Sequence, residues 1–253
     1  MGMLKARDVR VRYGEHTAVD HLSFDLKAGQ WLMLVGPNGA GKSTMIETIS
    51  RGVPYIGEIL LEGKDIRRFK PAQLAREIGV LSQKNTVGYA YTVEEVVGLG
   101  RYAHASGFLS ARDDEERDWV AKALEQTGLT NLRHASVLTL SGGELQRAFL
   151  AQVFAQNPRI LILDEPANHL DLVYQKHIFS LIEEWLKQPG RAVISVVHDL
   201  SLAKRYGTHA VLLHQGRSVA QGTLREVLTP GNLQSVYEMD VYGWMREMLE
   251  QWV

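Results

Sequence analysis

The stretch Gly36-Pro37-Asn38-Gly39-Ala40-Gly41-Lys42-Ser43-Thr44 decides the fold of this chain. It follows the apolar run 30–35, which predicts a strand buried on both faces, and it leads into a helix predicted over 42–50. The stretch matches the pattern G-x-x-x-x-G-K-[ST], in which glycines let backbone N–H groups converge on phosphate oxygens at a helix N-terminus. Lys42 can reach the β- and γ-phosphates of a nucleotide, and the Ser43 hydroxyl can ligate Mg²⁺. The strand before and the helix after favour a phosphate-binding loop over a chance glycine-rich turn.

An acidic pair ends a later strand, Ile160-Leu161-Ile162-Leu163-Asp164-Glu165. Asp164 would hold Mg²⁺, directly or through water, and Glu165 would polarise an attacking water as general base. On their own, two carboxylates often simply end a strand. With the phosphate-binding loop upstream, the pair indicates nucleotide hydrolysis.

A third stretch, Leu140-Ser141-Gly142-Gly143-Glu144, lies between these two and opens a helix predicted over 144–155. Two glycines before a helix expose backbone donors to an anion. The same residues also read as a capping box, with Ser141 as N-cap and Glu144 as its partner. A cap and an anion contact are compatible, so both interpretations stand.

In this order, the three stretches resemble the ATP-binding cassette (ABC) ATPases. The resemblance implies that the turn at Ser141, Gly142 and Gly143 faces the γ-phosphate of an ATP held by the opposite subunit. It also implies roles for four single residues: Tyr13 stacks on adenine, Gln83 contacts Mg²⁺ or water and senses a membrane partner, Asp171 lies at a dimer interface, and His198 contacts the γ-phosphate and orients the water.

Each of these four residues also has a simpler interpretation. They could be an ordinary strand tyrosine, a solvated glutamine, a helix N-cap and a structural histidine. Two positions depart from the family pattern, because Glu144 stands where glutamine is common and Ala167 where threonine is usual. Neither removes a catalytic group, so an active ATPase is expected, with ATP and Mg²⁺ bound. The resemblance assigns catalysis to Lys42, Gln83, Glu165 and His198, metal ligation to Ser43, Gln83 and Asp164, and nucleotide contacts to Tyr13, Gly36 through Thr44, Ser141, Gly142, Gly143 and Asp171.

The pattern of the whole chain predicts an α/β fold of the P-loop NTPase type. Apolar and polar residues alternate over 4–11 and 18–26, which predicts an N-terminal antiparallel β part. Strands and helices alternate after residue 160, which implies a mostly parallel core sheet with ligands at the carboxyl ends of the strands. Residues 84–155 read as an inserted helical subdomain carrying the signature stretch. The predicted division is a RecA-like core of 1–83 and 156–253, with the helical part at 84–155.

Composition limits the partners of the chain. The 253 residues carry a net charge of −1 without a long like-charge block, so no nucleic-acid partner is expected. The absence of cysteine excludes disulfides and thiolate metal sites. The longest apolar runs are far shorter than the roughly 20 residues that cross a bilayer, so a membrane role requires a partner.

One phosphate-binding loop and one signature stretch in a chain imply that two copies meet head to tail to complete the sites. The resemblance then implies the ATP-binding subunit of a transporter. It would lie on the cytoplasmic face of the membrane, bound to integral permease subunits and acting indirectly with an extracytoplasmic substrate-binding protein. Segments 91–102, 198–206 and 222–230 resemble the ATPases of importers for iron-siderophores, haem and cobalamin. The alternatives are an importer of another substrate and a soluble assembly ATPase of the iron–sulfur cluster type.

Two further segments have predicted contacts. Residues 84–101 would dock the permease. The amphipathic stretch 241–252 repeats apolar residues at helical spacing, so we expect it to pack on its own domain, with a dimer contact as the alternative.

Overall fold

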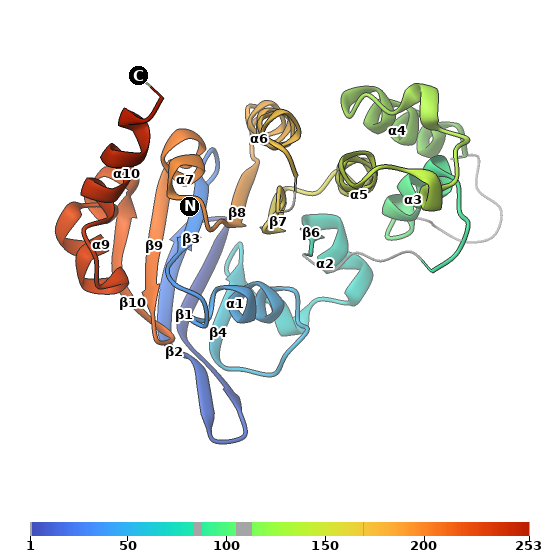
Figure 1. Ribbon diagram of the computed structural model, residues 1–253. Helices are drawn as coiled ribbons and strands as arrows, with labels where there is room; N and C mark the ends of the chain where they lie inside the picture. Colours follow the sequence, from blue (N-terminus) through green and yellow to red (C-terminus); the bar gives the residue numbers. More distant parts are fainter. Residues whose placement is uncertain (1, 83–87, 105–112, 169, 253) are drawn as a thin grey trace. The chain divides into compact units, whose positions relative to one another are not determined.

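The computed structural model describes residues 2–82, 88–104, 113–168 and 170–252 (Figure 1). The chain forms two compact units: the first combines Met1–Arg67 with Ile194–Val253, and the second is Arg68–Val193. The boundary therefore falls within one strand, β8 (Ala192–Val196). The predicted division into a core and a helical subdomain at 84–155 stays a prediction.

The first unit contains an antiparallel sheet in the order β2-β1-β4-β5. Its strands are β1 (Leu4–Tyr13), β2 (His16–Leu26), β4 (Ile56–Leu61) and β5 (Lys64–Asp65). In the C-terminal half of β2, buried residues such as Leu22 and Leu26 alternate with exposed ones, as expected for a strand with one face on the core. This sheet is the antiparallel N-terminal part that the sequence predicts.

A parallel pair of strands carries the phosphate-binding loop in the first unit. β3 (Trp31–Val35) runs parallel to β9 (His209–His214), and all five residues of β3 are buried, as predicted for a strand covered on both faces. β10 (Arg217–Thr223) pairs antiparallel with β9 at the edge. The helices of this unit are α1 (Lys42–Ile49), α7 (Leu200–Tyr206), α8 (Leu224–Val227), α9 (Pro230–Tyr237) and α10 (Val241–Glu250).

The second unit joins a parallel pair of strands to a group of helices. β6 (Ile78–Leu81) pairs parallel with β7 (Ile160–Asp164). The helices are α2 (Pro71–Glu77), α3 (Val93–Gly98), α4 (Asp113–Gln126), α5 (Gly142–Gln156) and α6 (Leu172–Leu186). α3, α4 and α5 pack against one another (Figure 1). The helical character predicted before residue 155 is thus confirmed over the described part of that segment, and the strand pairings agree with the predicted fold class.

The C-terminal helix α10 departs from its prediction. Val241 is buried, and the Tyr242 hydroxyl donates a hydrogen bond of 2.6 Å to the Leu228 carbonyl. Beyond this first turn, the apolar side chains Trp244, Met248 and Leu249 are exposed. The expectation that the amphipathic face packs on its own domain is therefore wrong for most of its length, because α10 is anchored only at its N-terminal end.

Over the described ranges, none of the helices has both the length and the apolarity needed to cross a bilayer.

Candidate nucleotide-binding site

The glycines of the loop between β3 and α1 are required by close backbone approaches in the first unit. A Cβ atom on Gly36 would lie 2.2 Å from the Leu213 carbonyl oxygen, and one on Gly41 would lie 2.3 Å from the Ala18 carbonyl oxygen. Both residues also have positive φ values, 145° and 94°. The loop is therefore pressed against the ends of β2 and β9, and only glycine fits at these two positions.

Lys42 is directed at its own loop. Its side chain is only 5% exposed, and Nζ donates hydrogen bonds of 2.8 Å to the carbonyl oxygens of Gly36 and Pro37. Two neutral carbonyls are weaker partners for an ammonium than phosphate oxygens are. The buried amine and the loop thus suit an anion with several oxygens, such as a nucleotide phosphate.

The N-terminus of α1 is built to receive an anion. Its N-cap, Gly41, supplies no side-chain capping bond, and the first turn carries no acidic residue. Ser43 and Thr44 are half-buried in this turn. The backbone donors and the helix dipole are consequently directed at the loop without a competing carboxylate.

Two tyrosines from distant elements contact this region. Tyr13 ends β1, is 47% exposed, and donates a hydrogen bond of 3.4 Å to Glu47 on α1, so its ring stands at the surface beside the helix. Tyr237 ends α9 and makes a hydrogen bond with the backbone of Gly36, and burial raises the pKa of its phenol. No sequence pattern marks Tyr237, and its contact with the loop became visible only in the structure.

His198 lies close to where the sequence places it, two residues after the end of β8, and it is exposed. The next residue, Asp199, caps α7 by accepting hydrogen bonds from the backbone N–H groups of Ser201 at 2.7 Å and Leu202 at 3.4 Å. The cap fixes the backbone immediately after His198.

The acidic pair ends β7 in the second unit. Asp164 is the buried last residue of the strand, and Glu165 has a left-handed φ of 53°. A non-glycine residue in this region is uncommon and costs free energy, which favours a functional reason for it. Asn168 donates from Nδ2 to the Glu165 carboxylate at 2.6 Å and from its backbone N–H to the Glu165 carbonyl at 3.1 Å. Asn168, which the sequence motifs did not single out, therefore orients the carboxylate.

Ser141 caps α5 as predicted. The Ser141 hydroxyl accepts from the Glu144 backbone N–H at 3.3 Å, and the Glu144 carboxylate accepts from the Ser141 backbone N–H at 2.8 Å. That hydrogen bond from the Ser141 backbone lowers the pKa of Glu144. A glutamate in place of the common glutamine thus still completes the capping box.

Asp171 caps α6 and lies in the same unit as the Ser141 turn. It accepts a hydrogen bond of 3.0 Å from the backbone N–H of Tyr174, whose ring lies against Gly143 so closely that a Cβ there would be 3.0 Å from it. Gln146 on α5 also donates to the Pro166 carbonyl at 2.8 Å. The starts of α5 and α6 and the turn after β7 are therefore tied together.

The predicted site residues divide between the two units. The first unit brings together Tyr13 and Gly36 through Thr44 and also contains His198; the second contains Ser141, Gly142, Gly143, Asp164, Glu165 and Asp171. Gln83 lies outside the described residues.

Comparison with known proteins agrees with this set of motifs. The family model described as "ABC transporter" matches residues 19–168. The chain is 38% identical to the ferric enterobactin transport ATP-binding protein of Escherichia coli, over 92% of this chain and 86% of that protein. It is 40% identical to the hemin import ATP-binding protein of Chelativorans sp., over 93% and 91%.

A solved structure of a metal-chelate type ABC transporter in an inward-facing conformation superimposes with a TM-score of 0.82. The identity is 25%, and the match covers 95% of this chain and 90% of that one. The matched family model, the two relatives and this structure agree with the fold predicted from the sequence. The chain therefore belongs to the ABC transporter family and is an ABC-type ATPase.

Proposed function

We propose that this chain hydrolyses ATP to drive the import of an iron chelate, a siderophore complex or haem, or of a cobalamin-type compound. The observation that carries the proposal is the glycine-built loop with its buried Lys42, whose Nζ lies 2.8 Å from two loop carbonyls. The substrate class is supported by the likeness to the ferric enterobactin and hemin import proteins.

The nucleotide is held from the first unit. Backbone N–H groups of the loop from Asn38 through Thr44 receive its phosphates, and Lys42 exchanges the carbonyl oxygens of Gly36 and Pro37 for phosphate oxygens. The exposed ring of Tyr13 offers a face on which adenine stacks.

Mg²⁺ suits the oxygen ligands that the motifs offer, and when bound it neutralises charge that develops on the phosphates. Ser43 and Asp164 would supply two of these ligands, and Gln83 a third. Glu165 accepts the proton of the attacking water, with its carboxylate oriented by Asn168 at 2.6 Å. His198 contacts the γ-phosphate.

A second copy of the chain completes each site. The Ser141 turn presents the N-terminus of α5, a helix that carries Gly142 and Gly143 in its first turn, to the nucleotide bound by the other copy. The exposed Asp171 lies at the same interface. ATP binding closes the pair and hydrolysis releases it, which supplies the conformational change that a permease needs.

The permease contacts the helical subdomain, 84–155. Exposed aromatic and apolar side chains gather on the described part of its first stretch: Tyr89, Tyr91, Leu99 and Tyr102. This surface would hold the chain at the cytoplasmic face of the membrane and link it indirectly to an extracytoplasmic substrate-binding protein.

A pull-down of the full chain carrying Glu165→Gln, in mild detergent with ATP and Mg²⁺, tests the proposal. We expect a multi-span permease and a substrate-binding protein among the captured proteins. The binding protein is then screened against ferric siderophores, haem and cobalamin. Capture of soluble assembly proteins without a permease would refute import and support the scaffold alternative.

A further inference from the structure

The hairpin turn between β9 and β10 contacts the phosphate-binding loop through its backbone. The Gly216 backbone N–H donates a hydrogen bond of 3.2 Å to the Ala40 carbonyl. Gln215 and Gly216 both have positive φ, 49° and 80°, and a Cβ on Gly216 would lie 2.9 Å from the Ala18 carbonyl oxygen. The turn is therefore a tight one that reaches the loop through its backbone.

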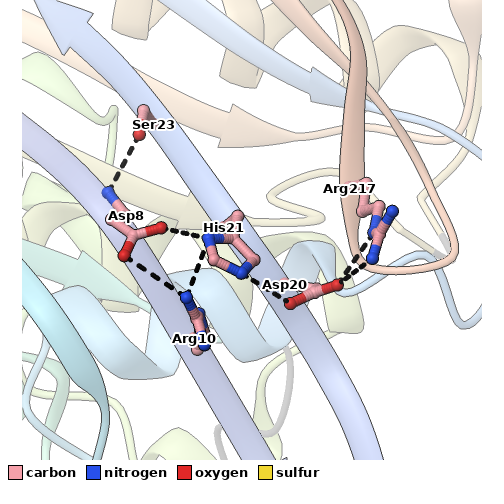
Figure 2. Close-up of polar contacts among 6 residues, drawn as sticks. All are labelled: Asp8, Arg10, Asp20, His21, Ser23 and Arg217. Carbon is pink, nitrogen blue, oxygen red and sulfur yellow. Dashed lines mark hydrogen bonds and ion pairs between the residues drawn. The ribbon is translucent and has the colours of Figure 1, made fainter.

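Asp20 on β2 contacts this turn through both its backbone and its side chain. Its backbone N–H donates to the Gly216 carbonyl at 2.8 Å, and its carboxylate accepts from Arg217 Nε at 2.8 Å and Nη2 at 2.6 Å. Figure 2 shows the paired guanidinium and carboxylate, which join residues 197 positions apart in the chain. Asp20 is thus linked to the hairpin turn twice, by the backbone hydrogen bond to Gly216 and by the side-chain ion pair with Arg217.

Asp20 is itself anchored by a cluster on β1 and β2 (Figure 2). His21 Nε2 lies 3.7 Å from the Asp20 carboxylate, and its Nδ1 contacts both the Asp8 carboxylate and Arg10. Asp8 and His21 have left-handed φ values of 49° and 54°, in a part of the β1–β2 ladder where the register shifts. These contacts fix the backbone of β2 at Asp20 from the side opposite to the hairpin.

The hydrogen bond from Gly216 to the Ala40 carbonyl also sets the direction of the next backbone N–H, that of Gly41. In a trans peptide, the carbonyl of one residue and the N–H of the next point in opposite directions. A carbonyl of Ala40 held toward Gly216 therefore points the Gly41 N–H away from the hairpin. Gly41 is the residue before Lys42, in the centre of the motif that receives phosphate.

We propose that Asp20 and Arg217 are positioning residues for ATP binding, acting through Gly216 and Ala40 on the orientation of the Gly41 N–H. This inference rests on the proposed function of the loop. Neither side chain touches the nucleotide. Their pairing keeps the hairpin turn seated, so the donor is already aimed before ATP arrives and less ordering is required on binding.

The chain offers a matched control on the same strand. Asp25 on β2 carries a cationic partner, Lys5, with Nζ 3.0 Å from its carboxylate, and none of the hydrogen bonds among the described residues joins its side chain to the hairpin turn. We would compare Asp20→Asn with Asp25→Asn in the full chain, by titration with ATP and Mg²⁺ and by thermal unfolding. Asp20→Asn is expected to weaken ATP affinity about two- to fivefold, on the scale of an exposed ion pair, while Asp25→Asn leaves it unchanged.

Arg217→Gln gives a second, independent variant and should reproduce the loss seen with Asp20→Asn. The double variant should lose no more than either alone, because both changes break one contact. Exchange of the charges, Asp20→Arg with Arg217→Asp, should recover part of the affinity, which a loss of general stability would not do.

Equal ATP affinity in Asp20→Asn, Asp25→Asn and the unsubstituted chain would overturn the inference. So would an equal loss in the two asparagine variants. A chain that does not bind ATP, or binds it as well after Lys42→Ala, would instead overturn the proposed function of the loop and this inference with it.

Discussion

Gly41→Ala provides a direct test of the loop's construction. The new Cβ would lie 2.3 Å from the Ala18 carbonyl oxygen, whereas Cβ contacts under 3.0 Å are essentially never seen. The loop or β2 must therefore move by at least about 0.7 Å, the difference between these two distances. A misplacement of reacting groups by about 1 Å can lower a catalytic rate by about a hundredfold.

Gly39→Ala is the matched control. Gly39 has a φ of 78°, close to the 94° of Gly41, yet a Cβ there would meet nothing within 4 Å. Its substitution introduces only the conformational strain of a left-handed residue, about 1–2 kcal/mol of unfolding free energy. The two variants thus share the strain and differ in the collision.

The assay is the rate of ATP hydrolysis by each full-length variant in the presence of Mg²⁺, with thermal unfolding measured in parallel. We expect Gly41→Ala to lose hydrolysis rate by about a hundredfold and Gly39→Ala by much less, although both unfold at lower temperature. If Gly41→Ala hydrolysed ATP as fast as Gly39→Ala, the close approach to Ala18 would not govern the loop, and the reasoning would fail.

Three further predictions concern the second unit. Glu165→Gln should abolish turnover and trap an ATP-bound dimer in size-exclusion chromatography; normal turnover would remove Glu165 from the role of general base. Ser141→Arg should block hydrolysis by preventing closure of the dimer while ATP still binds to the single chain, so normal turnover would contradict a site shared by two copies. The hydrogen bond from Ser141 lowers the pKa of Glu144 in the folded chain, so this carboxylate stabilises the fold above its unfolded pKa, and that contribution is lost as pH falls through the folded value. The difference in unfolding free energy between the unsubstituted chain and Glu144→Ala, from urea unfolding, should therefore shrink from pH 7 toward pH 4, and a constant difference would refute the charge-dependent cap.

The sequence predicts the buried strands because their apolar runs are uninterrupted. Trp31–Val35 and Ile160–Leu163 are short and wholly apolar, the first followed by Gly36 and the second by Asp164, so their position and character agree with the structure. The edge strand β10 escaped prediction. Its sequence, RSVAQGT, has little apolar alternation, because the strand pairs with β9 and most of it is exposed.

The candidate site likewise contains residues that the sequence predicts and residues that only the structure shows. Motif residues are found from sequence because their chemistry depends on neighbours a few positions away, as in the loop around Lys42 or the capping box of Ser141. Tyr237 and the pair of Asp20 and Arg217 could not be found, since their contacts to the loop join residues far apart in the chain. Only the fold brings such residues together.

The ties within the second unit have a consequence for how two copies would act. Under the proposed function, Glu165 serves the nucleotide bound by its own chain, whereas the Ser141 turn serves the nucleotide of the partner. In the structure, Gln146 on α5 is bonded to Pro166, the residue after Glu165, at 2.8 Å. The ring of Tyr174, one turn into the helix capped by Asp171, lies against Gly143.

These contacts join the turn of Glu165 to the Ser141 turn, which under the proposed function serve the two different nucleotides. We expect a displacement of one turn to displace the other, because close-packed protein interiors transmit strain. Hydrolysis at the site that Glu165 serves would in this way alter the contact of the Ser141 turn with the partner's nucleotide. The coupling would pass through the second unit of a single chain, without a separate signalling element.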